Sequence, residues 1–311
     1  FNSFQVAAFY CFSPLDEVTI PSLVHRLTKN AIKQQVRGTV LLASEGVNGT
    51  ICGPVHGVAS LLDDLRLLLL KVPMEIKFSF TPKQAFRRFK ARRKAEIVTM
   101  GVVGVNPIES VGTYVEPRDW NPFLDDPSTL VVDTRNEYEV AIGGFDRALN
   151  PHTNIFREFP SWVDQYLRPL VEERSPERIA MFCTGGIRCE KATSYLNRQG
   201  FTGVHHLHGG ILRYLEEVPQ KESLWKGECF VFDQRVALNH KLLRGIHRLC
   251  HACGMPLAPE ERDDMSYIHG VQCHHCKDRF SDQDRARFAE RQRQIDERSM
   301  NLLENSSRPE L

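Results

Sequence analysis

The stretch IAMFCTGGIRCEKA, residues 179–192, decides the fold of the central part of the chain. Its first four residues are apolar, two glycines interrupt it, and its last part has helical spacing. This pattern predicts a buried strand over 179–182, a tight turn, and a helix over 190–198 that begins near Cys189. The turn therefore lies at the carboxyl end of a strand, where α/β proteins place their functional sites.

The segments on either side repeat the same alternation. The short apolar run at 130–132 predicts a buried strand, residues 204–207 predict a further strand, and residues 162–170 have the spacing of a helix. Strands that alternate with helices indicate a parallel α/β sheet. We place this domain at residues 110–222.

The turn after the strand has the composition of a reactive-thiol loop. Its glycines allow positive φ, so that backbone N–H groups can converge above the sulfur, and an arginine and a helix N-terminus add positive potential. Both effects lower the pKa of a thiol and favour the reactive thiolate. The predicted loop consists of Cys183, Thr184, Gly185, Gly186, Ile187 and Arg188, with Cys183 and Arg188 as the catalytic pair.

Other interpretations of this loop were weighed. Cys183 could be an inert thiol at a strand end, but packing alone does not explain the two glycines and the arginine beside it. A phosphatase loop needs an arginine six positions after the cysteine, whereas Arg188 follows at five and position 189 is a cysteine. Cys189 is either a buried thiol of the first helical turn or a thiol that resolves an oxidised Cys183.

The first eighty residues predict a different domain. Strands are expected at 4–12, 39–43, 50–52 and 75–80, helices at 21–36 and 55–71, and a glycine-dependent hairpin turn at 45–49. The order βαββαβ indicates a ferredoxin-like (acylphosphatase-like) α+β domain, which we place at residues 1–95 together with a basic connector.

The connector is a local concentration of positive charge. Seven cations lie within twelve positions and no acidic residue interrupts them: Lys83, Arg87, Arg88, Lys90, Arg92, Arg93 and Lys94. Such density favours RNA phosphates, and the interleaved Phe86 and Phe89 could stack on bases. The alternative is a solvated helix face with both rings buried, which we prefer for the two phenylalanines.

The last part of the chain, residues 223–311, is rich in cysteine and histidine and ends in a helix. Two Cys-x-x-Cys pairs separated by nineteen residues have the spacing of a zinc ribbon: Cys250 and Cys253, then Cys273 and Cys276. Four thiolates close the coordination shell, so that this Zn²⁺ would be structural. His251, His274 and His275 could replace a ligand, although such histidines more often lie at the surface.

Composition limits the protein class. The 311 residues include 41% hydrophobic and 25% charged residues, which is typical of globular proteins. Lys and Arg (40) balance Asp and Glu (39), so RNA could be attracted only by a local patch. No apolar run approaches the roughly 20 residues of a membrane span, and the opening residues show no secretory signal. We therefore expect no membrane partner and a cytoplasmic location.

Several motifs give the chain a family resemblance. Asp133-Thr134-Arg135 with Glu139, the loop at Cys183, and Leu207 to Gly210 before an apolar helix resemble the rhodanese superfamily, with Asp133 and Arg135 in supporting roles. Five longer strings are similar to a bacterial tRNA uridine hydroxylase family that has a central rhodanese domain: SEGVNGT (44–50), FREFPSWV (156–163), FCTGGIRCEKA (182–192), HGGILRYLEEVP (208–219) and GECFVFDQRVAL (227–238).

This resemblance implies an activity and a partner. It implies oxygen-dependent hydroxylation of uridine 34 in tRNA anticodon loops to 5-hydroxyuridine, with Cys183 as the active residue and molecular oxygen as co-substrate. The sequence itself carries no flavin or NAD motif. Two rival functions stay open at this point: a rhodanese-type sulfurtransferase that forms a persulfide on Cys183, and a noncatalytic RNA-binding zinc adaptor.

Overall fold

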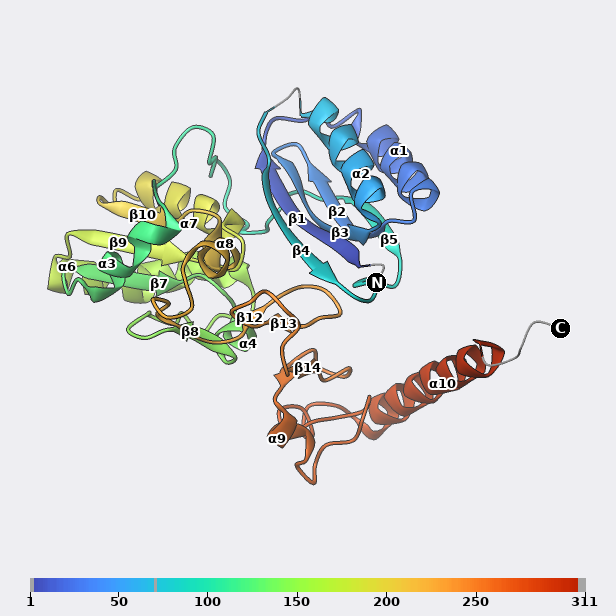
Figure 1. Cartoon of the computed structure of the whole chain (residues 1–311). Coiled ribbons are helices and arrows are strands. Elements are labelled where there is room, and N and C mark those ends of the chain that lie inside the picture. The colour runs from blue at the N-terminus through green and yellow to red at the C-terminus, as the bar shows by residue number, and fades with distance from the viewer. Residues whose placement is uncertain (1–2, 70–71, 307–311) are drawn as a thin grey trace. The chain divides into compact units, whose positions relative to one another are not determined.

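The computed structural model of the chain describes residues 3–69 and 72–306. The described residues through Gly245 form one compact unit, and those from Ile246 onward form a second. The first unit contains two sheets with their helices, and the second contains a small cysteine-rich module and a long helix (Figure 1). No helix within these described ranges is long and apolar enough to cross a membrane.

The first sheet confirms the predicted ferredoxin-like domain. Helices α1 (Ile20–Lys33) and α2 (Val55–Leu68) cover one face of it (Figure 1). The predicted last residues of α2, 70 and 71, lie outside the described residues. The sheet has the order β4-β1-β3-β2-β5, with β1 (Phe4–Phe12), β2 (Arg37–Ala43), β3 (Gly46–Gly53), β4 (Glu75–Thr81) and β5 (Phe89–Arg93).

The hairpin between β2 and β3 is tighter than predicted. Only Ser44 and Glu45 form the turn, so most of the expected turn at 45–49 belongs to β3. Gly46 adopts φ of +142°, and a Cβ there would lie 2.0 Å from the carbonyl oxygen of Cys11. The glycine is therefore required by the close approach of β1 and not by the turn itself.

The interpretation of residues 83–94 as a connector or a helix face was wrong in its central part. Residues 89–93 form β5, an edge strand that pairs in parallel with β2. Phe89 and Ala91 alternate with cations and pack against the core below the sheet, which is the pattern of a strand with one buried face. Positive charges along an exposed edge also discourage pairing with other chains.

The second sheet is parallel throughout, as predicted. Its order is β6-β10-β9-β7, with β6 (Thr113–Val115), β7 (Thr129–Asp133), β9 (Arg178–Phe182) and β10 (Val204–Leu207). The helices around it are α3 (Trp120–Asp125), α4 (Glu137–Val140), α5 (Phe159–Trp162), a π-helical segment (Val163–Leu167), α6 (Arg168–Arg174), α7 (Ile187–Arg198) and α8 (Gly210–Glu217), with single 3₁₀ turns at Pro117–Asp119 and Phe156–Glu158.

Helix α7 begins earlier than predicted. It starts at Ile187 and not near Cys189, so that Ile187 and Arg188 belong to its first turn and the loop is shorter than the expected six residues. Its N-terminus therefore lies closer to Cys183 than the sequence indicated, which places the positive end of the helix dipole at the thiol.

Two short antiparallel ladders complete the first unit. Strand β8 (Gly143–Phe145) pairs with β11 (Trp225–Gly227), and β12 (Cys229–Phe230) pairs with β13 (Ala237–Leu238). Phe145 and Trp225 pack edge to face with a centroid distance of 5.1 Å, in the hydrophobic core beside the parallel sheet. The second unit contains β14 (Arg248–Leu249), β15 (Pro256–Leu257), α9 (Pro259–Arg262) and α10 (Asp282–Ser306).

Candidate active site

Cys183 lies directly after the end of β9, in the turn that leads into α7. Strand β9 is central in its sheet and apolar on both faces, so it fixes the position of the residue that follows it. Cys183 is fully buried, and the backbone N–H of Gly186 donates a hydrogen bond to its Sγ at 3.1 Å. The carbonyl groups of Cys183 and Thr184 accept hydrogen bonds from the first turn of α8, which holds the loop from below.

The two loop glycines have different roles. Gly186 adopts φ of +103°, and a Cβ there would lie 2.8 Å from the hydroxyl of Tyr10. Gly185 is not among the glycines with positive φ, contrary to expectation, and a Cβ on it would meet no atom within 4 Å. Gly186 is therefore required by its positive φ and by the nearby Tyr10 hydroxyl, whereas a side chain at Gly185 would extend into open space.

The surroundings of Cys183 favour its thiolate. Burial alone would raise the pKa of this thiol. Hydrogen bonding from the Cys189 thiol, the charge of Arg188 and the N–H groups of Cys189 and Gly186 outweigh burial and hold the pKa of Cys183 well below its usual value. Burial and the neighbouring sulfur raise the pKa of Cys189, so that Cys189 stays protonated and donates. The pair contains one thiolate and one thiol.

Arg188 is buried and bound to Glu139. Its Nη1 donates to Glu139 Oε2 at 2.6 Å and its Nη2 donates to Glu139 Oε1 at 2.7 Å. The Thr184 hydroxyl donates to the same carboxylate at 3.1 Å. The guanidinium charge therefore acts both on Glu139 and on the Cys183 thiolate.

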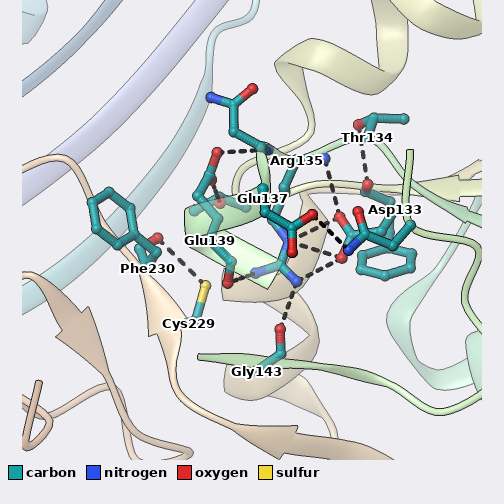
Figure 2. Close-up of polar contacts among 12 residues, drawn as sticks. Asp133, Thr134, Arg135, Glu137, Glu139, Gly143, Cys229 and Phe230 are labelled. Carbon is teal, nitrogen blue, oxygen red and sulfur yellow. Dashed lines mark hydrogen bonds and ion pairs between the residues drawn. The ribbon is translucent and has the colours of Figure 1, made fainter. Parts of the chain in front are cut away.

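Asp133 and Arg135 form a second polar cluster beside Glu139, as Figure 2 shows. The Nε and Nη2 atoms of Arg135 donate to the carboxylate of Asp133 at 2.9 and 2.6 Å, and the fully buried guanidinium also donates to the carbonyl groups of Glu139 and Gly143. Arg135 therefore fixes the backbone of α4 and β8, and through α4 it positions Glu139.

A cavity of about 440 Å³ opens above Cys183, which is within the usual range of ligand pockets, about 300–1,000 Å³. One wall is the loop at Cys183, and the opposite wall is the face of the first sheet that α1 and α2 leave uncovered. The lining is mostly apolar, and hydroxyls, one amide and one ammonium group interrupt it, which suits a planar ligand with polar edges. The sheet contributes Tyr10, Thr39, Asn48, Thr50, Lys77 and Ser79.

Two residues of that wall contact the loop at Cys183 or α7 and were missed from the sequence. The Nζ of Lys77 donates to the carbonyl oxygen of Gly185 at 2.8 Å, and the Tyr10 hydroxyl donates to Glu190 Oε1 at 2.7 Å. Burial lowers the pKa of Lys77 and, together with Glu190, raises that of Tyr10. Their strands were predicted, but nothing in the sequence pairs them with α7 or with the loop.

The basic stretch borders the same cavity. By its register with β2, β5 places Lys90 beside Thr39 and Arg92 beside Leu41, and both of these β2 residues line the cavity. Arg93 points to the other face and forms an ion pair with Glu17. Within the described part of the chain, the other six cations form no ion pair, and five of them are exposed: Lys83, Arg87, Arg88, Arg92 and Lys94. Phe86 and Phe89 are half-buried in the sheet.

The four cysteines of the second unit lie close enough to hold one ion. Their Sγ atoms lie within 4.8 Å of one another, with distances of 3.9, 3.7 and 3.7 Å for the pairs 250/276, 253/273 and 273/276. A tetrahedral zinc with Zn–S bonds of about 2.3 Å separates its sulfurs by about 3.8 Å. The cluster therefore fits zinc. His274 and His275 contact Glu261 at 3.4 and 3.3 Å instead of completing this cluster.

Comparison with known proteins places these features in a family. Residues 4–97 match the UPF0176 acylphosphatase like domain, and residues 120–217 match the Rhodanese-like domain. The chain is 64% identical over 296 residues to the tRNA uridine(34) hydroxylase of Prochlorococcus marinus strain MIT 9313, covering 95% of this chain and 96% of the relative. It is 61% identical over 299 residues to the protein of that name from Parasynechococcus marenigrum strain WH8102, covering 94% and 93%.

Proposed function

Because this chain belongs to the tRNA uridine(34) hydroxylase family, we propose that it hydroxylates uridine 34 of tRNA and that the reaction takes place in the cavity above Cys183. It is an oxidoreductase, and tRNA is its substrate. One observation carries the location: the Cys183 thiolate lies at the floor of a cavity of about 440 Å³ that two domains enclose. A base can reach it only by leaving its stack, as bases of single-stranded loops do.

We propose that the product is 5-hydroxyuridine and that molecular oxygen supplies the new oxygen atom. Addition of the Cys183 thiolate to C6 of uracil would place an electron pair on C5 and O4, and C5 would then take up one oxygen atom. Loss of the C5 proton would expel the thiolate and restore the ring. The second atom of O₂ leaves as water, which consumes two protons and two electrons from a reductant.

The residues around the loop have defined tasks in this proposal. The Gly186 N–H and the charge of Arg188 stabilise the thiolate when it leaves. Lys77, with its Nζ at the cavity wall 2.8 Å from the Gly185 carbonyl, supplies positive charge for a developing uracil oxyanion. Glu139 and Arg135 hold Arg188 in place without touching the substrate.

We propose that the anticodon loop lies along β5, with its phosphates on the cations of the basic stretch. The positions of Lys90 and Arg92 on the cavity face of the sheet support this path. The division into residues 1–95, 110–222 and 223–311 is part of the same proposal. The first domain binds RNA and the second carries out the chemistry. Within the third, a structural Zn²⁺ on four cysteines stabilises the residues from Ile246 onward. A tRNA substrate also implies a cytoplasmic location.

Nucleoside mass spectrometry tests the proposal. The chain and its Cys183→Ala variant are each expressed in bacterial cells that lack their own tRNA uridine(34) hydroxylase. We expect 5-hydroxyuridine and its derivatives to return with the parent chain and to be absent with Cys183→Ala, because the thiolate is lost while the fold is kept. A normal level of 5-hydroxyuridine with Cys183→Ala would contradict Cys183 as the active residue. If the parent chain restored a thiolated nucleoside instead, the result would indicate sulfur transfer.

A further inference from the structure

Phe232 is an exposed aromatic ring at the wall of the cavity that contains Cys183. It lies between β12 and β13, and 59% of it is exposed while its neighbours Val231 and Asp233 are buried. It lines the cavity together with Cys183 and Arg188. The string that contains it, residues 227–238, has no role in the reaction described above.

The other rings of the cavity are unsuited to contact a planar ligand. Phe9, Tyr10 and Phe156 are buried, and Phe86 is half-buried against Val6 and Ala85. Phe78 is exposed, but it pairs with Ala7 on the neighbouring strand. The side chain of Ala7 packs in the core under α1 and α2. Because paired residues point to the same face of a sheet, Phe78 points to the helix-covered face. Among the described lining residues, Phe232 therefore presents the most accessible aromatic surface to the cavity.

The loop that carries Phe232 is held rigidly against the first domain. The Nε and Nη2 atoms of Arg235 donate to the Asp233 carboxylate at 2.9 and 2.6 Å. Its Nη1 donates to Ser79 Oγ at 2.7 Å. The N–H of Gln234 donates to the carbonyl oxygen of Ala85 at 3.0 Å, directly before the basic stretch. Val236 adopts φ of +70°, a strained conformation for a β-branched residue. Such strain persists only where the surroundings fix the backbone, as they do at ligand clamps.

The ring is also supported by its neighbours. The edge of Phe230 meets it at a centroid distance of 5.2 Å, and the guanidinium carbon of Arg188 lies 5.9 Å from its centroid. On the strand next to the cavity, the register with β2 places Lys90 and Arg92 beside the lining residues Thr39 and Leu41. A fixed ring and a line of cations at one cavity are the two elements with which proteins bind unpaired nucleotides.

We propose that Phe232 is the stacking platform for the base that enters the Cys183 cavity, and that this base is uridine 34. The inference rests on the proposed function and deepens it, because it names the residue that holds the flipped uracil over the thiolate. Phe232 is a positioning residue: it supplies a π-face and takes no part in proton or electron transfer.

Kinetics with tRNA that lacks the modification tests this role. Stacking of a base on an aromatic side chain contributes about 1–3 kcal/mol, so Phe232→Ala should lower kcat/KM by about 5- to 150-fold at 1.4 kcal/mol per tenfold. Phe232→Leu keeps bulk but removes the π-face and should lose nearly as much, whereas Phe232→Tyr should keep the parent value. Phe80→Ala is the matched control, because Phe80 is 54% exposed on β4 and does not line the cavity.

A binding measurement separates this inference from the chemistry. In the Cys183→Ala background, the added tryptophan of Phe232→Trp should be quenched by tRNA with uridine 34 and much less by tRNA with an abasic position 34. The same protein without Phe232→Trp corrects for the three native tryptophans. Equal quenching by both tRNAs, or a Phe232→Leu enzyme with parental kcat/KM, would overturn the role of Phe232 and leave that of Cys183 standing. Product formation by Cys183→Ala would overturn the proposed role of Cys183 whatever Phe232 does.

Discussion

The guanidinium of Arg188 and the carboxylate of Glu139 form a buried bidentate ion pair, with N–O distances of 2.6 and 2.7 Å. This pair joins α4 to the first turn of α7 directly beside the reactive sulfur. It keeps a positive charge near Cys183 in a place where water cannot solvate it. The pair therefore stabilises the loop, and its positive charge favours the thiolate of Cys183.

Removing the charge of Glu139 should destabilise the protein strongly. Glu139→Gln removes the carboxylate charge that pairs with the buried Arg188 guanidinium, and breaking a buried ion pair in this way typically costs about 3–5 kcal/mol in free energy of unfolding. Chemical denaturation measures the loss. Asp63→Asn is the control, because Asp63 pairs with Arg66 at the surface, where both side chains are more than half exposed and such pairs contribute less than about 1 kcal/mol. Similar losses for both variants would contradict the role of the buried pair.

The pH dependence of kcat/KM should report the thiolate of Cys183. Its pKa is lowered in the folded protein, so activity should persist below the usual thiol value of about 8.5 and disappear as pH falls through the lowered value. Cys189→Ala removes a hydrogen-bond donor to the thiolate and should move this acid limb to higher pH. Cys229→Ala, at a buried thiol outside the loop, should not move it. An acid limb that stays in place with Cys189→Ala would refute the pairing of the two sulfurs.

Charge reversal on the basic stretch should weaken the salt dependence of tRNA binding. Each lost phosphate contact reduces the slope of log K against log salt by about 0.7–0.9. Arg88→Glu with Arg92→Glu should therefore flatten the slope by up to about two such steps. Lys29→Glu with Lys33→Glu changes the net charge equally on α1, which covers the opposite face of the sheet, and should keep the slope. Equal slopes for both double variants would argue against β5 as the RNA path.

The cysteine cluster should contain one zinc ion per chain. Metal analysis of the purified, reduced protein measures it, and Cys253→Ser should lower the zinc content and the melting temperature of the second unit, because a structural site loses one of its four ligands. His275→Ala should keep the zinc, since the four sulfurs alone lie within 4.8 Å of one another. Loss of zinc with His275→Ala but not with Cys253→Ser would reverse the ligand assignment.

The sequence predicted those parts of the fold that local patterns determine. The strand at 204–207 has the predicted bounds, and the strand before Cys183 begins one residue earlier than predicted, because short segments between turn signals have few alternatives. Strand β5 was missed because its cations were weighed more heavily than the alternation of Phe89 and Ala91. The start of α7 was predicted too late because the glycines before it carry no side-chain pattern that marks the first helical residue.

The contacts between the two walls of the cavity could not be predicted from the sequence. Tyr10 is 180 positions from Glu190, and Lys77 is 108 positions from Gly185, so only the packing of the two domains brings these residues together. No local spacing encodes such contacts. Glu139 was noted through the rhodanese resemblance, but its bond to Arg188 depends on how α4 meets α7.

The contact between Tyr10 and α7 has a consequence for evolution and for engineering. The Tyr10 hydroxyl occupies the space that any side chain at Gly186 would need, and the same hydroxyl bonds to Glu190 one turn further along the helix. A change in the first strand therefore demands a matching change in the seventh helix. A chimera that takes its rhodanese domain from a distant relative should therefore also take the residue at position 10 from that relative, although the two positions lie far apart in the gene.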